Sequence, residues 1–172
     1  GTTPPPATGL VPNASVETAS TAAPNVPDQW TASSWGSNTP TFQYVNEGHD
    51  GSKSVKVSVS SYTDGDAKWY FTPQALQRGG TYKFSAWYKT NTLPKAVAMF
   101  QRDDGSEKYF GLPNPQPNGS TTDWQFYSDT FVVPNDVHHV SVFFFVNGNG
   151  WVQSDDYSVV PYQLVGFDRP LV

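Results

Sequence analysis

The sequence contains no cysteine and only 1 methionine among its 172 residues. Without cysteine, disulfide-stapled mini-proteins, thiolate zinc sites and cysteine nucleophiles are excluded. Basic residues are also scarce, because 10 lysines and arginines stand against 15 acidic residues, for a net charge of -5. Nucleic-acid affinity comes mainly from clustered basic side chains that meet phosphates, so we expect no nucleic-acid partner.

Long apolar segments and helical patterns are missing too. No run approaches the roughly 18 consecutive apolar residues of a membrane-spanning helix, so we expect no membrane partner. No stretch of about ten residues has helical periodicity, and proline interrupts helices. With 15 prolines in the chain, the sequence predicts very little helix.

Aromatic residues, in contrast, are abundant: 11 phenylalanines, 9 tyrosines and 6 tryptophans. Such rings either fill the core of a β-sandwich, because they favour strands and bury large areas, or face outward as surfaces on which a ligand stacks. To find a binding site, the rings that fill the core must therefore be distinguished from the rings that face outward.

An alternation of apolar and polar residues dominates the chain from residue 10 onward, with glycine, proline, asparagine and aspartate interrupting it at short intervals. In residues 54–60, Val55, Val57 and Val59 share one face while lysine and serine occupy the other. This pattern predicts an all-β fold, an antiparallel β-sandwich (jelly roll) of about eight to ten strands in two sheets. Further strands are expected at 67–72, 81–90, 96–102, 108–111, 124–133, 140–147 and 156–165.

The ends of the chain differ from its middle. Residues 1–9 are rich in proline and threonine, which predicts an extended linker. Residues 10–166 are expected to form one β-sandwich domain, in keeping with their length. Residues 167–172 are expected to be a linker or the start of a following catalytic domain.

Four segments resemble, in order and spacing, motifs of a known protein family. They are 10–17 (LVPNASVE), 48–57 (GHDGSKSVKV), 76–89 (LQRGGTYKFSAWYK) and 124–134 (WQFYSDTFVVP), the last followed by 155–159 (DDYSV). With these motifs the chain resembles the β-jelly-roll carbohydrate-binding modules of families 4, 16 and 22, which are appended to bacterial polysaccharide-degrading enzymes. Val16 stands where the family usually has phenylalanine. The resemblance is more specific for the fold than for a ligand.

The resemblance also implies one structural Ca²⁺. Carried over to this sequence, Glu17 and Asp156 would supply side-chain oxygens, and Asp50 and Lys53 would supply carbonyl oxygens. A hard cation prefers such ligands, and two acids next to apolar strand residues are costly to bury without a partner. The alternative is that these acids pair with Lys53 or Arg169, or face water.

The last residues, 166–172 (GFDRPLV), are similar to the segment that enters the first barrel strand of polysaccharide deacetylases. This similarity implies that the chain is the non-catalytic N-terminal module of a larger enzyme. We therefore expect a secreted, bacterial protein that is covalently linked to a catalytic domain and is itself monomeric.

A sugar site needs flat aromatic surface bordered by hydrogen-bonding groups, because a pyranose ring has an apolar face and a rim of hydroxyls. In residues 81–89, Tyr82, Phe84 and Tyr88 share an apolar face that we assign to the core. Trp87 lies on the other, polar face and is the ring most expected to meet a sugar. Trp124 matches a family position that is usually in the core.

Other strands offer further candidates whose register the sequence does not decide. In residues 97–102, either Gln101 or Arg102 reaches the polar face. In residues 140–147, both faces are apolar at the centre, so Phe143 or Phe145 lies either under a covering loop or in a binding groove. The remaining candidates for ligand contact are Trp69, Tyr109 and Asn147.

Catalysis is not expected. Glycoside hydrolysis needs two carboxylates about 5–9.5 Å apart, one with a raised pKa. Asp103 and Asp104 precede a glycine in an evident turn, and Asp155 and Asp156 point to opposite faces if the strand is extended. No phosphate-binding glycine loop, nucleophile elbow or zinc-protease motif is present.

The sequence therefore predicts a non-catalytic polysaccharide-binding module that acts through aromatic stacking and hydrogen bonds. Holding a linked enzyme on its substrate raises the effective concentration of that substrate. The alternative is a structural or interdomain accessory module of a polysaccharide deacetylase or glycoside hydrolase. Such a module has no glycan affinity of its own, and its rings lie in the core or under the catalytic domain.

Overall fold

A computed structural model describes residues 9–163, which form eleven β-strands and no helix that could cross a membrane. The expected tail at 167–172 and all but Gly9 of the expected linker lie outside these residues. The strands are β1 (Trp30–Trp35), β2 (Thr39–Val45), β3 (Ser54–Ser60), β4 (Asp66–Phe71), β5 (Gln74–Ala75), β6 (Thr81–Thr90), β7 (Lys95–Arg102), β8 (Glu107–Gly111), β9 (Gln125–Val132), β10 (Val137–Val146) and β11 (Gly150–Pro161).

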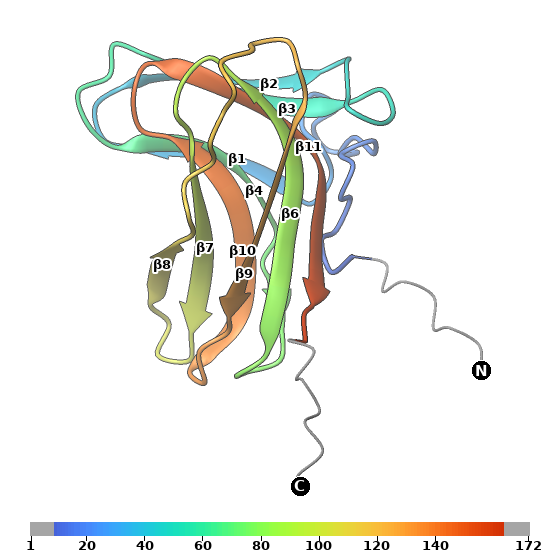
Figure 1. Ribbon diagram of the computed structural model, residues 1–172, viewed down its shortest axis with the longest axis vertical. Helices are drawn as coiled ribbons and strands as arrows, with labels where there is room; N and C mark the ends of the chain where they lie inside the picture. The colour runs from blue at the N-terminus through green and yellow to red at the C-terminus, as the bar shows by residue number, and fades with distance from the viewer. Residues whose placement is uncertain (1–8, 164–172) are drawn as a thin grey trace, which may run out of the picture.

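The strands form two sheets that pack face to face (Figure 1). The six-stranded sheet has the order β1-β4-β10-β7-β8, with β5 paired to β10, and the five-stranded sheet has the order β2-β3-β11-β6-β9. Every pairing between these strands is antiparallel. The predicted all-β sandwich is confirmed, with slightly more strands than expected.

The strands that the sequence did not predict are β1, β2 and the very short β5. Both β1 and β2 are edge strands that pair on one side only. They contain serine, threonine and a proline, so they lack the clear alternation of apolar and polar residues that predicts a strand. β11 begins at Gly150 rather than at residue 156. A register shift between Asp155 and Ser158, with Asp156 at φ 52°, breaks the alternation there.

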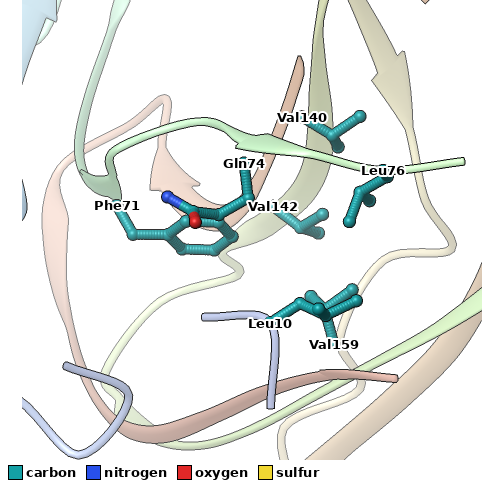
Figure 2. Close-up of a pocket in the computed structure, with 7 residues that line it drawn as sticks. All are labelled: Leu10, Phe71, Gln74, Leu76, Val140, Val142 and Val159. Carbon is teal, nitrogen blue, oxygen red and sulfur yellow. The ribbon is translucent and has the colours of Figure 1, made fainter. Parts of the chain in front are cut away.

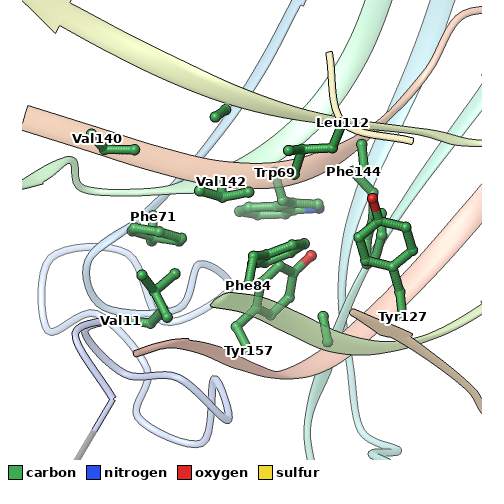
Figure 3. Packing of buried hydrophobic residues seen from close by; sticks show 14 of the residues in the cluster. Val11, Trp69, Phe71, Phe84, Leu112, Tyr127, Val140, Val142, Phe144 and Tyr157 are labelled. Atoms are coloured by element: carbon green, nitrogen blue, oxygen red, sulfur yellow. The ribbon is translucent and has the colours of Figure 1, made fainter. Parts of the chain in front are cut away.

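The core between the sheets consists largely of rings. β6 alternates along its whole length, so Tyr82, Phe84, Ala86 and Tyr88 are buried as predicted. Phe84 lies 5.9 Å, between ring centroids, from each of three other aromatic rings (Figure 3). These three rings are Tyr127, Phe144 and Tyr157. Part of the aromatic surplus is therefore explained by packing.

The segment before β1 closes one side of this core. The backbone N–H of Leu10 donates a hydrogen bond to the carbonyl of Val159 at 3.1 Å. Figure 2 shows Leu10 and Val159 facing Phe71, Leu76 and side chains of β10 across a narrow recess. This recess leaves no room for a water molecule, so it is part of the packed interior and not a ligand site.

We predict that Phe84→Ala lowers the free energy of unfolding by about 3–5 kcal/mol, because it removes a ring that is completely buried and leaves a cavity. Urea denaturation measures this change. Phe126, an exposed ring on the outer face of the neighbouring strand, is the control, and Phe126→Ala should cost no more than about 0.5 kcal/mol. Equal losses in the two variants would show that Phe84 is not central to the packing.

Candidate functional site

A hollow of about 570 Å³ lies on the outer face of the six-stranded sheet. Its lining comes from β1, β4 and β8: Ser33 and Trp35, Asp66 and Lys68, and Tyr109. Because β1 and β8 are the opposite edges of this sheet, both can line one hollow only if the sheet curls around it. A hollow of this volume is in the range of small-molecule sites.

In the strand order, β10 and β7 lie between β4 and β8, so we take the residues of these two strands that face away from the core as the floor of the hollow. Val97, Met99 and Phe143 make a second buried cluster, separate from the main core. Tyr70 and Phe145 pack against it and are partly exposed. The floor is therefore apolar and already filled, which leaves the walls to make polar or stacking contacts.

The walls carry two large exposed rings. Trp35 is 61% exposed and Tyr109 is 52% exposed. The Tyr109 hydroxyl donates a hydrogen bond to Glu107 Oε2 at 3.1 Å. Desolvation, followed by the influence of Glu107, raises the pKa of Tyr109 to about 12, so the phenol stays neutral at physiological pH.

Between the walls lies a charged pair. Asp66 Oδ1 accepts a hydrogen bond from Lys68 Nζ at 2.7 Å, and Asp66 Oδ2 accepts one from Trp35 Nε1 at 2.9 Å. Lys68 is only 7% exposed, which is unusual for lysine. The hollow thus combines exposed rings with fixed hydrogen-bonding groups, the combination that a sugar ring requires.

Comparison with known families agrees with this geometry. The sequence profile of a family described as "Carbohydrate binding domain" matches residues 11–155, most of the chain. The chain belongs to this family. A search of curated protein sequences finds no relative that matches this chain.

Solved structures share its fold at low identity. The enzymatically active domain of tailspike protein 4 from bacteriophage CBA120 is 21% identical with a TM-score of 0.66, and the alignment covers 90% of this chain and only 21% of that one. The CBM22-1 xylan-binding domain of Paenibacillus barcinonensis Xyn10C is 10% identical with a TM-score of 0.59, and the alignment covers 87% of this chain and 92% of that one. The CBM22-1-GH10 modules of Clostridium thermocellum Xyn10B, in complex with xylohexaose, are 16% identical with a TM-score of 0.59, covering 83% of this chain and 28% of that one.

Several residues expected to contact a ligand lie on the face that bears the hollow. Tyr109 lines the hollow, and Phe145 is partly exposed beside its floor. Gln101 pairs with Glu107 on one side and His139 on the other, so it shares this outer face. Asn147 is exposed and comes directly after β10. Arg102, the last residue of β7, instead lies on the core-facing side of the strand, in alternation with Ala98 and Phe100.

For Trp69 and Phe143 the structure corrects the prediction of ligand contact. Trp69 faces the core, is 4% exposed and donates its indole N–H to the carbonyl of Lys56 at 3.0 Å. Phe143 points to the outer face but is 1% exposed, with its ring centroid 5.9 Å from that of Tyr70. A sugar has no access to either ring. The covering of Phe143 by neighbouring side chains is not visible in the alternation of β10.

Trp87 lies on the opposite side of the carbohydrate-binding domain, on the outer face of the five-stranded sheet. Its ring stacks on His49 at 4.1 Å between centroids and lies 5.1 Å from Phe126. The structure therefore does not bring Trp87 together with Tyr109. Trp124, expected in the core, is partly exposed beside His49, with Lys89 Nζ 4.7 Å from its ring centroid.

Four residues of the hollow were missed by the sequence reasoning: Ser33, Trp35, Asp66 and Lys68. Trp35 ends an edge strand that the sequence did not predict. Asp66 and Lys68 lie on one face of β4, opposite the face of its buried apolar residues, Ala67, Trp69 and Phe71. A lysine and an aspartate two positions apart on one face of an otherwise apolar strand were the signal that could have found them.

The acids expected to bind Ca²⁺ are distributed around the loop between β2 and β3. The Glu17 carboxylate accepts hydrogen bonds from the backbone N–H groups of Ser52 and Lys53 at 3.0 and 3.1 Å. Asp156 Oδ2 lies 2.7 Å from His49 Nδ1, and Asp50 is exposed. Within residues 9–163, no three His, Asp or Glu side chains form a group that could hold a metal ion.

Asp155, next to the expected ligand Asp156, is a buried acid without a cationic partner among the described residues. Its side chain is completely buried and accepts hydrogen bonds from the backbone N–H groups of His49 and Asp156, at 2.8 and 2.7 Å. Burial first, and then the charge of Asp156, raise the pKa of Asp155 to about 7. No Lys, Arg or His of the described residues forms an ion pair with Asp155. This donor suits a hard cation.

A close backbone crossing supports the Trp35 wall. Gly65 has φ +89°, and a methyl group there would overlap the carbonyl oxygen of Trp35. We predict that Gly65→Ala lowers the free energy of unfolding by about 3 kcal/mol, through left-handed strain and this overlap together. Urea denaturation measures the change.

Gly105 is the matched control for this variant, because it has φ +85° but no atom lies within 4 Å of an added methyl group. Gly105→Ala should cost only about 1–2 kcal/mol, the strain alone. If the two variants lose the same stability, the crossing at Trp35 is not tight.

Proposed function

We propose that the hollow binds a polysaccharide chain, with Trp35 and Tyr109 stacking against sugar rings. The observation that carries this proposal is the presence of two exposed rings on opposite walls of one hollow, with a buried ion pair between them. The apolar C–H faces of a sugar lose water against such rings. The family to which the chain belongs supports the same kind of ligand.

The polar groups of the hollow suit the hydroxyl rim of a sugar. Lys68 Nζ carries three hydrogens, and Asp66 is its hydrogen-bond partner among the described residues, so two N–H donors are free to meet hydroxyl oxygens. Gln101 and Glu107 add an amide and a carboxylate on the same face. Buried donors of this kind discriminate strongly, because a ligand that leaves them unpaired loses affinity.

In this role the domain contributes binding and no catalysis. We propose that it is a secreted bacterial module, monomeric and linked to a carbohydrate-active enzyme, and that it keeps this enzyme near its substrate. The fusion of a similar module to GH10 modules in Clostridium thermocellum Xyn10B supports such an arrangement.

Calorimetric titration tests the glycan site with xylohexaose, cellohexaose, mannohexaose and β-1,4-galactotriose. We expect at least one of them to bind, and Trp35→Ala and Tyr109→Ala each to weaken that binding by about 1–3 kcal/mol, the scale of one lost aromatic contact. Phe126→Ala, which removes an exposed ring from the opposite sheet, should leave the affinity unchanged.

Two results would contradict this site. If a glycan binds and neither Trp35→Ala nor Tyr109→Ala weakens it, the hollow is not where it binds. If no sugar of the panel and no soluble polysaccharide binds to a folded domain, the domain is a structural accessory module.

We also propose that one structural Ca²⁺ binds beside the loop between β2 and β3. Its oxygens would come from Glu17, from the Asp155–Asp156 pair, and from the carbonyls of Asp50 and Lys53. The buried Asp155 carboxyl, whose pKa burial raises to about 7, supports this placement, because a cation there would offset the cost of ionising it.

Removal of Ca²⁺ is therefore expected to destabilise the domain. At a Ca²⁺ concentration of about 100 Kd the ion contributes about 2.7 kcal/mol, so excess EDTA should lower Tm by about 5–10 °C, and added Ca²⁺ should restore it. Asp155→Asn should make Tm insensitive to EDTA. An unchanged Tm of the wild-type domain in EDTA would rule the ion out.

A further inference from the structure

We infer that Asp66 is the positioning and specificity-determining residue of the hollow: it holds the Trp35 ring in place and cancels the charge of Lys68, so that uncharged sugars are preferred to uronic acids. The inference rests on the proposed function of the hollow. It follows from the different partners of the two Asp66 oxygens, one of which accepts from an indole and the other from an ammonium group.

The Trp35 ring depends on Asp66 for its orientation. It is 61% exposed at the end of an edge strand, and within residues 9–163 it makes no contact with another aromatic ring. Its backbone is fixed, because Asn38 Nδ2 donates to its carbonyl at 3.0 Å and Gly65 crosses beside it. The hydrogen bond from Nε1 to Asp66 Oδ2 is then the polar contact that selects one side-chain rotamer. A ring that is oriented before the ligand arrives loses less freedom on binding.

The Lys68 ammonium depends on Asp66 for its neutralisation. The Lys68 side chain is 9% exposed, and Asp66 is its ion-pair partner at 2.7 Å among the described residues. A buried ammonium without a counter-charge is strongly unfavourable and attracts an anion. The Lys68 ammonium and the Asp66 carboxylate together carry no net charge, and the pair still offers N–H donors, which suits hydroxyl oxygens. Without Asp66, the same amine would favour the carboxylate of a uronic acid.

The decisive variant is Asp66→Asn, because the amide keeps the shape of the side chain but has no charge and only one acceptor oxygen. We expect its affinity for the neutral oligosaccharide bound by the wild type to fall about 5- to 20-fold, the scale of a lost contact plus lost preorganisation. Binding of hexagalacturonate should rise at least tenfold relative to the wild type and should weaken as salt is added. The double variant Asp66→Asn/Lys68→Gln should lose this gain.

Two further variants separate the roles. Trp35→Phe removes the indole N–H but leaves the ion pair, so it should weaken binding of the neutral oligosaccharide without any gain for hexagalacturonate. Asp123→Asn makes the same charge change at an exposed aspartate whose carboxylate accepts no hydrogen bond within the described residues, and it should change neither affinity.

An NMR measurement in the absence of sugar tests whether Asp66 positions the Trp35 ring, independently of glycan binding. The ¹⁵N heteronuclear NOE of the Trp35 indole should fall in Asp66→Asn and stay unchanged in Asp123→Asn. If it does not fall, Asp66 does not position the ring. If Trp35→Ala abolishes glycan binding but Asp66→Asn changes neither neutral nor acidic binding, the inference is wrong and the proposed function stands. If no variant of the hollow alters glycan binding, the proposed function fails, and the NOE alone decides the positioning role.

Discussion

The two-residue alternation of β10 is the constraint on which both faces of the six-stranded sheet depend. Val140, Val142 and Phe144 enter the core, while Phe143 and Phe145 face the other way and build the floor of the hollow. Because both sets are apolar, a shift of one residue would still bury hydrophobic surface but would exchange the core with the floor. The pairing of β10 with β7 along most of its length holds the register that keeps these roles apart.

Much of the fold could be predicted because it follows from local patterns. The alternation of residues 54–60 and 81–90 coincides with the bounds of β3 and β6. The outer surfaces could not be assigned in the same way. Alternation places Trp87 on the polar face of residues 81–89 without saying whether that face binds a ligand, and it assigns no face to Trp35, whose strand was not predicted. Whether a sheet curls around a hollow depends on how distant strands pair, which no local pattern contains.

Trp69 illustrates a second limit of sequence reasoning. Lys68, Trp69 and Tyr70 are three consecutive residues of β4, and one face of that strand must meet the core. Trp69 was a candidate for ligand contact and the charge of Lys68 was given no role, yet the structure buries both side chains on opposite faces. A lysine can be buried there because Asp66 lies two residues away on the same face, a pairing that hydrophobicity alone does not predict.

The carbohydrate-binding domain therefore has two outer faces of different character. The five-stranded sheet carries Trp87, but His49 stacks on this ring and the loop between β2 and β3 covers part of that face. The six-stranded sheet carries rings of comparable size that remain open, because the residues that line its hollow come from strands and not from a covering loop.

The placement of Trp35 on β1 and Tyr109 on β8 separates recognition from stability within a single sheet. These two strands have a neighbour on one side only, whereas the central strands β4, β10 and β7 supply most of the side chains that this sheet buries. Changes at the rim can therefore alter the width and chemistry of the hollow while the packed interior stays the same. For protein engineering, β1 and β8 are the natural positions to vary when a new glycan preference is sought on this scaffold.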